Sequence, residues 1–420
     1  MRRLLLTFVL LALGWTLAAA PAHARTFTAP CVGPMKSGPM CHFWTARAVS
    51  VNDGDTIGAV VDGTHKVWQV RFTGAQAMEL HTYNWKHLTG ECNAVAAARR
   101  VKQLLRKSHN RILLSAQNPN KRFDVRLGRW IDVKVHGRWR DLYSFEMAEG
   151  HVLWMPDETE TAWNNVYNKL SQQAAQKQIG LWDPTHCGVG PHQDVPLRMW
   201  VNWDPHGIDV SNLNDEWVKI QNLSTTESLP LTQWWMRDSG LRRFTFPRGT
   251  VLRPGATITI HDGPGQNTDS DLFWNIHAAV FQNIGDGAYL FDPQGDIRTY
   301  MVYPCVVACS DPNQGALRIS TQLKGTQYVQ VQNVSNHAVN LYGYQLDKPG
   351  WPYDFGPNTV LQPGETLRVD LDGATAQNSQ FDRHWGMPYP HLHRDGDVVR
   401  VATFNNITIA CDAWGGFSCS

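Results

Sequence analysis

The pattern of apolar and polar positions divides the chain into two parts of different character. In the first part, 49–61 and 66–73 are β-rich runs separated by the turn Asp62-Gly63, as expected for two strands. They recur at helical spacing over 94–105, and a last long helix is expected over 163–180. This mixture of strands and helices predicts a barrel-like α+β domain over 25–190.

From about Val195 onwards the helical spacing disappears. Short β-rich runs alternate there with turns rich in Pro, Gly, Asn and Asp, a pattern typical of β-sandwiches. The segment 184–196, which contains Gly188 and Gly190, is the expected linker. The chain is therefore expected to be multi-domain.

The β-rich part repeats itself. Glu-Trp-Val-Lys-Ile-Gln-Asn at 216–222 is echoed by Gln-Tyr-Val-Gln-Val-Gln-Asn at 327–333. Thr-Val-Leu-Arg-Pro-Gly, which begins at Thr250, is echoed by Thr-Val-Leu-Gln-Pro-Gly from Thr359. The offset of about 110 residues suits one immunoglobulin-like sandwich for each copy. We expect the two copies to occupy 191–310 and 311–420.

The N-terminus predicts export. Arg2 and Arg3 precede an apolar run over 4–13, and small residues end in Ala22-His23-Ala24, so 1–24 has the pattern of a secretory signal peptide. The run is shorter than the roughly 20 residues of a membrane span, although a retained anchor is the alternative. We expect a secreted, extracellular protein with no transmembrane segment after cleavage.

The eight cysteines all follow this segment. An even number in an exported chain favours disulfides, and no Cys-x-x-Cys pair or Cys/His quartet indicates zinc. Eight cysteines permit 105 connectivities, so the pairing is a hypothesis based on short separations and on the matching ends of the two repeats. The hypothetical pairs are Cys31–Cys41, Cys92–Cys187, Cys305–Cys309 and Cys411–Cys419.

Several short motifs follow one another in the first domain. They are Asn-Asp-Gly-Asp-Thr at 52–56, then Arg71 and Glu79, then Leu-Gly-Arg-Trp at 127–130, and last Gln-Ile-Gly-Leu-Trp at 178–182. In this order and spacing, they resemble the staphylococcal-nuclease (thermonuclease) family. The resemblance covers about a third of the chain and implies an OB-fold barrel with helices.

The resemblance also implies roles for individual residues. Asp55 would bind a metal, Glu79 would activate water, and Arg71 and Arg129 would hold the phosphate. Carboxylate oxygens suit Ca²⁺, and the planar guanidinium donates two parallel hydrogen bonds to a phosphate. The alternative is that the Asp-Gly-Asp turn only closes a hairpin and that the arginines and Glu79 are solvated.

One position departs from the family. Gln76 stands where the family has a second metal-binding Asp. An amide oxygen can still bind Ca²⁺, but the site loses one negative charge. We therefore expect weaker calcium binding, a different metal, or binding of substrate without catalysis.

Strand parity and local charge bear on the substrate. Arg71 lies opposite Val70 and Phe72 on its strand, and Arg129 begins an apolar row, where a charge is costly without a partner. We therefore prefer Arg129 to Arg126 as the second phosphate ligand. The net charge is +1, so affinity for nucleic acid needs a local basic region. The candidate substrate-binding residues are Lys121, Arg122 and Arg126, with a solvated strand edge as the alternative.

Residues 195–310 and 311–411 resemble lamin tail domains, which have an immunoglobulin-like fold. The resemblance rests on 216–222, on Trp-Met-Arg-Asp-Ser-Gly from Trp235, and on Phe246-Pro247. The second copy departs more, with Leu-Asp-Lys at 346–348. A nuclease-like domain followed by such tails resembles an arrangement in exported actinobacterial proteins.

These observations predict a secreted nuclease that hydrolyses phosphodiester bonds of DNA or RNA with the help of a metal. The tail domains would bind the cell wall, another surface ligand or the substrate. The alternative is a non-catalytic exported protein that binds nucleic acid or a surface with a degenerate nuclease fold. A structural protein with a vestigial barrel is a third reading.

Overall fold

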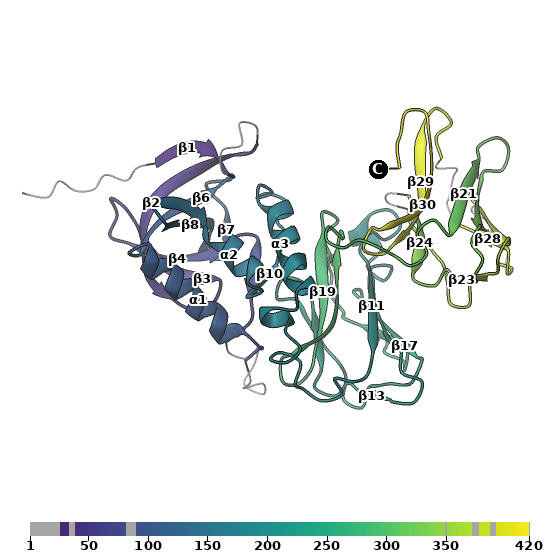
Figure 1. Cartoon of the computed structure of the whole chain (residues 1–420), viewed down its shortest axis with the longest axis horizontal. Coiled ribbons are helices and arrows are strands. Elements are labelled where there is room, and N and C mark those ends of the chain that lie inside the picture. The colour runs from purple at the N-terminus through teal and green to yellow at the C-terminus, as the bar shows by residue number, and fades with distance from the viewer. Residues whose placement is uncertain are drawn as a thin grey trace, which may run out of the picture.

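The computed structural model describes residues 26–32, 38–80, 90–348, 351–371, 378–386 and 392–419. The predicted signal peptide lies outside these residues. The described chain is mostly β, and three units follow one another in chain order from the N-terminal barrel to the C-terminal sheets (Figure 1). No helix in this part of the chain is both long and apolar enough to cross a membrane.

The first unit is a closed five-strand barrel. Its strands are β2 (Met40–Val51), β3 (Thr56–Val61), β4 (Val67–Phe72), β8 (Arg126–Val135) and β6 (Arg111–Ala116), in that order around the barrel. β6 pairs back to β2 and closes the ring, and β4 and β8 are the parallel neighbours. β2 can contribute to several pairings because it is twelve residues long and carries a register shift between Ala48 and Ser50.

Short strands extend the barrel at its edges. β1 (Thr26–Pro30) pairs with β2, while β7 (Arg122–Phe123) and β9 (Arg138–Asp141) pair with β8. β5 (Ala75–Ala77) and β10 (Val152–Trp154) form a separate two-stranded sheet.

The described part of this unit has three α-helices: the first two contact the barrel strand β8, and the third contacts the second helix and β10. They are α1 (Ala94–Lys107), α2 (Leu142–Ala148) and α3 (Asn164–Gln176), and a 3₁₀ turn, η1 (Gly180–Trp182), follows them. The helical spacing over 94–105 corresponds to the buried face of α1, which includes Val101 and Leu104. The opposite face of α1 is exposed and basic.

The second and third units have the same sheet order. In the second, the sheet β11-β12-β17-β18 faces the sheet β15-β14-β19-β20 across a shared apolar core. In the third, β21-β22-β27-β28 faces β25-β24-β29-β30 in the same way. Each unit also has a two-stranded piece, β13-β16 or β23-β26.

The bounds of the second unit are β11 (Leu197–Asn202), η2 (Asp209–Ser211), β12 (Trp217–Asn222), β13 (Leu229–Pro230), β14 (Trp235–Arg237), β15 (Arg243–Thr245), β16 (Val251–Leu252), β17 (Thr257–His261), β18 (Asp271–Phe273), β19 (Asp286–Phe291) and β20 (Ile297–Tyr303). Those of the third are β21 (Leu317–Gln322), β22 (Tyr328–Asn333), β23 (Val339–Asn340), β24 (Tyr344–Asp347), β25 (Tyr353–Asp354), β26 (Val360–Leu361), β27 (Thr366–Asp370), β28 (Asp382–His384), β29 (Asp397–Thr403) and β30 (Thr408–Trp414).

The barrel and the second unit share one core. Trp235, Tyr289 and Phe291 of the second unit belong to the barrel's cluster of buried side chains. The rings of Trp235 and Phe291 stack with their centroids 5.4 Å apart. Burial of apolar surface is the main favourable contribution to association, so we expect the interface between the barrel and the second unit to be stable.

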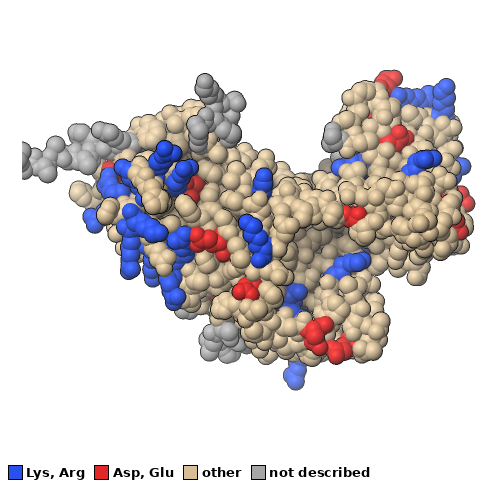
Figure 2. Space-filling view, in the orientation of Figure 1, with Lys and Arg blue, Asp and Glu red and all other residues tan. Residues whose placement is uncertain are grey.

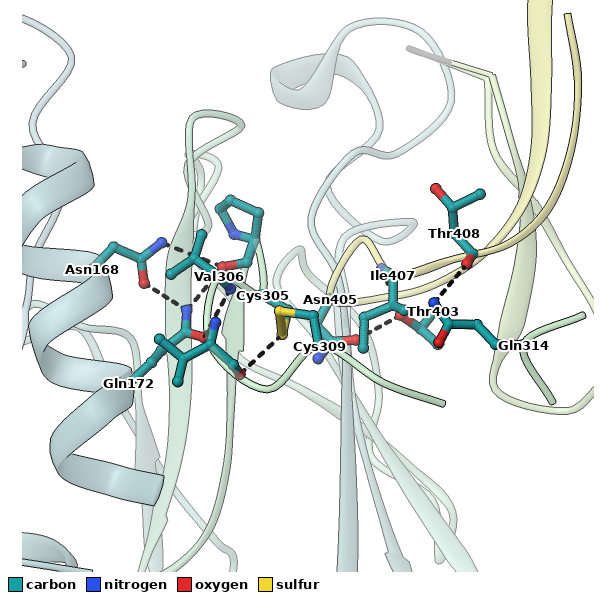
Figure 3. The surroundings of a disulfide bond; sticks show 12 residues. Asn168, Gln172, Cys305, Val306, Cys309, Gln314, Thr403, Asn405, Ile407 and Thr408 are labelled. Atoms are coloured by element: carbon teal, nitrogen blue, oxygen red, sulfur yellow. Dashed lines mark hydrogen bonds between the residues drawn. A yellow bond between two sulfur atoms is a disulfide. The ribbon is translucent and has the colours of Figure 1, made fainter. Parts of the chain in front are cut away.

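The four predicted disulfides are confirmed. Cys92–Cys187 joins the start of α1 to the segment after η1, across 95 positions of sequence. Cys305–Cys309 lies where the units meet: Gln172 of α3 accepts hydrogen bonds from the main chain at Val306 and Val307, and the Cys305 amide donates to Asn405 (Figure 3). The disulfides thus stabilise both single units and the contacts between them.

Candidate functional site

Asp55 and Arg71 meet at the start of the second barrel strand. Thr56 pairs with Arg71 in the register of β3 and β4, so the residue before Thr56 lies beside the arginine. Arg71 Nη1 is 2.7 Å from Asp55 Oδ1, and both side chains are buried. Arg71 was predicted to lie on the opposite face of its strand from Val70 and Phe72. On that face its guanidinium meets the carboxylate of Asp55.

Both carboxylate oxygens of Asp55 accept further hydrogen bonds from the protein. Thr56 Oγ1 donates to Oδ1 at 3.0 Å, and the Ala77 amide donates to Oδ2 at 2.8 Å. Asp53 accepts from the Asp55 amide and so closes the turn. Burial, followed by the charge of Asp55, raises the pKa of Asp53 to about 6.

Gln76 completes the surroundings of the guanidinium. Arg71 Nη2 donates to Gln76 Oε1, and Nη1 donates to the Ala75 carbonyl at 3.1 Å. Arg71 thus bridges the two side chains that were predicted to bind calcium. Those oxygens face a cation of the protein itself, so the described arrangement does not fit a calcium ion, whose ligands would have to be released from Arg71.

Glu79 lies beside this cluster and is only partly buried. Gln76 Nε2 donates to Glu79 Oε1 at 3.1 Å, and the Glu79 amide donates to Glu91 at 2.9 Å. Burial, then the negative charges of Asp55 and Glu91, raises the pKa of Glu79 to about 7. The structure therefore brings together Asp55, Arg71, Gln76 and Glu79.

Arg129 lies on a different face of the sheet. In the parallel ladder it pairs with Phe72, whereas Arg71 pairs with Gly128. Its guanidinium donates to the main-chain carbonyls of Lys121 and Pro119, at 3.0 and 2.7 Å, and lies 4.7 Å from the ring centroid of Trp44. Burial lowers its pKa to about 10. The guanidinium is thus held by main-chain carbonyls and the ring of Trp44, and the negative charge of Glu160 favours its charged form.

The predicted substrate-binding residues lie on the loop around β7. Lys121 Nζ is 2.5 Å from Asp157, and Arg126 is 3.6 Å from Asp124. The Arg122 guanidinium lies over the ring of Trp68 at 5.4 Å. Each of the three side chains thus has its own partner in this part of the barrel, and none of these partners is Asp55 or Glu79.

Other metal candidates are weak. Within the described ranges, the side chains close enough to share an ion are those of Cys92, His186 and Cys187, and both cysteines are in a disulfide. Oxidised sulfur cannot serve as a thiolate ligand.

Comparison with known proteins concerns the second unit. Residues 204–304 match the family model of the lamin tail domain. This match confirms the predicted resemblance for the first of the two repeats. No curated protein matches the chain.

The lamin tail domain contributes a residue that the sequence did not assign to the site. Arg237 of β14 is fully buried, and its Nη2 is 3.3 Å from Glu91 Oε2 and 3.6 Å from Met78 Sδ. Nη1 donates to the Gly240 carbonyl at 2.6 Å. The positive charge of Arg237 also acts on Glu79, where it opposes the increase in pKa.

Arg237 therefore connects the lamin tail domain to the carboxylates of the barrel. The Trp-Met-Arg-Asp-Ser-Gly motif marked this strand as part of a β-domain, but no sequence signal indicated which surface the strand would contact. A buried arginine in a short strand is uncommon, since buried charges need partners. Its burial, however, is visible only in the folded chain.

Proposed function

We propose that this chain is an exported nucleic-acid-binding protein whose barrel is an OB fold of the thermonuclease type, and that it holds its ligand without cleaving it. The order β2-β3-β4-β8-β6, with β4 and β8 parallel, supports the OB assignment. Asp55, Arg71, Gln76 and Glu79 occupy the positions of the family's motif residues, which supports descent from a phosphodiesterase.

The observation that carries the proposal is the position of Arg71 between Asp55 and Gln76. A metal-assisted phosphodiesterase needs carboxylate oxygens free for the ion and guanidinium groups free for the phosphate. In this protein, the guanidinium of Arg71 is paired with the carboxylate of Asp55 and with the amide oxygen of Gln76, so neither group is free for an ion or a phosphate. Arg129 is engaged with carbonyls and Trp44, so the second predicted phosphate ligand is also occupied.

The proposal also covers the export of the chain and the role of its two C-terminal units. Four disulfides favour an oxidising compartment, as does the signal-peptide pattern of 1–24. The third unit repeats the strand order of the lamin tail domain, which supports a second immunoglobulin-like sandwich. We propose that these two sandwiches bind a cell-wall or other surface ligand while the barrel holds nucleic acid.

A second candidate function is hydrolysis, and Glu79 favours it. A carboxyl group with a pKa of about 7 suits a general base at neutral pH. The group is partly exposed, so water can reach it. Hydrolysis would require Arg71 to leave Asp55 when the substrate binds.

The two functions are distinguished by incubating the mature protein with single-stranded DNA or RNA in Ca²⁺, in Mg²⁺ and in chelator. We expect retained binding and intact strands in every condition. Cleavage that Glu79→Gln and Arg71→Ala both abolish would establish the nuclease instead. Glu158→Gln, at an exposed glutamate of the same domain, is the matched control.

A further inference from the structure

The exposed side of α1 carries basic residues that no role above uses. Arg99, Lys102 and Arg106 are spaced at i, i+3 and i+7, so they form one stripe about 10 Å long on a helix that rises about 1.5 Å per residue. All three are exposed. Figure 2 shows basic side chains gathered over α1 and the neighbouring part of the barrel.

These charges are not neutralised by the protein. Among the residues that the structure describes, none of the three forms an ion pair, whereas Arg100 on the same helix donates to Glu149 at 2.7 Å. α1 has no acidic residue of its own. The stripe is therefore a surface of uncompensated positive charge, which attracts polyanions.

The stripe lines a groove. One hollow of about 470 Å³ lies between α1 and the residues Asn52 and Leu80, with Arg99, Lys102 and Arg106 on its helical wall. A second, of about 250 Å³, shares Lys102 and Arg106 and continues between α1 and β2. A third, of about 470 Å³, extends it past Asn110 to Arg47 and to Arg111, which is paired there with Asp62 at 2.8 Å.

The lining of the groove limits the kind of ligand. Among the described residues that line it, the uncharged ones include Val49, Leu80 and Val95, and none carries an aromatic ring. These residues offer phosphate contacts rather than a surface on which bases stack. A duplex is read by an element that enters its groove, whereas a single strand can lie in a hollow with its phosphates against the basic wall.

We propose that the groove between α1 and β2 binds the phosphate backbone of single-stranded nucleic acid without regard to its sequence. This inference rests on the proposed nucleic-acid binding and gives it a location. Arg99, Lys102 and Arg106 contact successive phosphates. The groove begins beside Asp53 and Glu79, since Asn52 and Leu80 are their neighbours in the chain. A bound strand therefore ends close to the carboxylate cluster, which repels it.

The test measures anisotropy of a labelled oligo-dT with full-length mature protein in chelator, over a series of salt concentrations. The triple variant Arg99→Gln, Lys102→Gln, Arg106→Gln is expected to bind about tenfold or more weakly at low salt. The slope of log K against log salt should decrease in magnitude by about 2, because three phosphate contacts are lost. Oligo-dA should bind as oligo-dT does.

The matched control removes the same charges elsewhere. Arg248→Gln, Arg253→Gln, Lys324→Gln changes exposed residues of the second and third units and should leave the affinity and the slope unchanged. Thermal melts of both triple variants should coincide with that of the wild type, since all six side chains are exposed.

The outcomes separate the two proposals. Wild-type protein that binds no oligonucleotide refutes both the proposed function and the groove. Wild-type binding that the groove variant retains refutes the groove alone, and a loss confined to Arg122→Gln, Arg126→Gln would assign the ligand to the loop around β7. Binding of heparin or anionic vesicles without oligonucleotide binding would also overturn the nucleic-acid assignment.

Discussion

The guanidinium of Arg237 lies 3.3 Å from the carboxylate of Glu91, across the joint between the lamin tail domain and the barrel. Glu91 in turn accepts from the amide of Glu79, so one buried ion pair connects the joint to the candidate site. Both partners are removed from water, which makes the pair costly to break from one side.

Removing Arg237 should therefore destabilise the chain strongly. Arg237→Met leaves the buried Glu91 without this cation, and we expect a loss of about 3–5 kcal/mol in unfolding free energy. Urea denaturation followed by Trp fluorescence measures it. Arg237→Met with Glu91→Gln should regain part of the loss. An equal loss in Arg248→Met, at an exposed arginine of the same domain, would contradict this explanation.

Restoring a carboxylate at position 76 should create calcium dependence. Gln76→Asp adds a negative charge beside Asp55 and Glu79, so three carboxylates face the single guanidinium of Arg71. The excess negative charge costs stability and is offset when Ca²⁺ binds the folded state. The melting temperature of the variant should rise with added Ca²⁺ while that of the wild type stays constant. Gln69→Asp, at an exposed position of β4, is the control and should not respond.

Glu79 should make stability depend on pH. Its pKa is about 7 in the folded chain and 4.5 in the reference state, so the folded state binds the extra proton. The resulting stability is fully present below pH 4.5 and is lost as the pH rises through 7. Glu79→Gln should flatten this part of the profile and gain stability relative to wild type at pH 8. Identical denaturation profiles of the two proteins from pH 5 to 8 would refute the shifted pKa.

The disulfides should differ in their contribution. Cys92–Cys187 closes a long loop, with a sequence separation of 95. Cys305–Cys309 closes a short loop, with a sequence separation of 4. Because a cross-link restricts the unfolded chain more when its loop is longer, Cys92→Ser, Cys187→Ser should cost about 2–5 kcal/mol and the other double variant less. Denaturant midpoints of the two variants provide the comparison, and the reverse order would exclude loop entropy as the main cause.

Some of the site could be predicted because its residues are close along the chain. Arg71 and Gln76 are five positions apart, and Asp55 directly precedes β3, the strand that pairs with the strand of Arg71. A hairpin brings such residues together whatever the rest of the fold does. Arg129 was harder to place, because its surroundings depend on the loop around Pro119 and on Trp44 of another strand.

Arg237 illustrates what local pattern leaves open. Its strand was recognised, and the sheet that contains it followed from alternation and turns. Whether the outer face of that sheet would contact solvent or the barrel depends on the shape of two surfaces more than a hundred positions apart in the chain. Gln76 was recognised as a departure from the family, but its hydrogen bond with Arg71 is decided by the folded chain.

By itself, the sequence indicated the tandem β-repeat and β-runs within the barrel, because these follow from alternation, spacing and turn residues. The cysteine pairs were a hypothesis from short separations, and the meeting of Asp55 with Arg71 was implied only by the family resemblance. The tertiary structure alone decided that Arg71 neutralises Asp55 and Gln76, that Arg129 stacks on Trp44, and that Arg237 reaches Glu91. The reason is that a buried charge takes whichever partner the packed fold brings within a few ångströms, and that partner is set by contacts between distant segments.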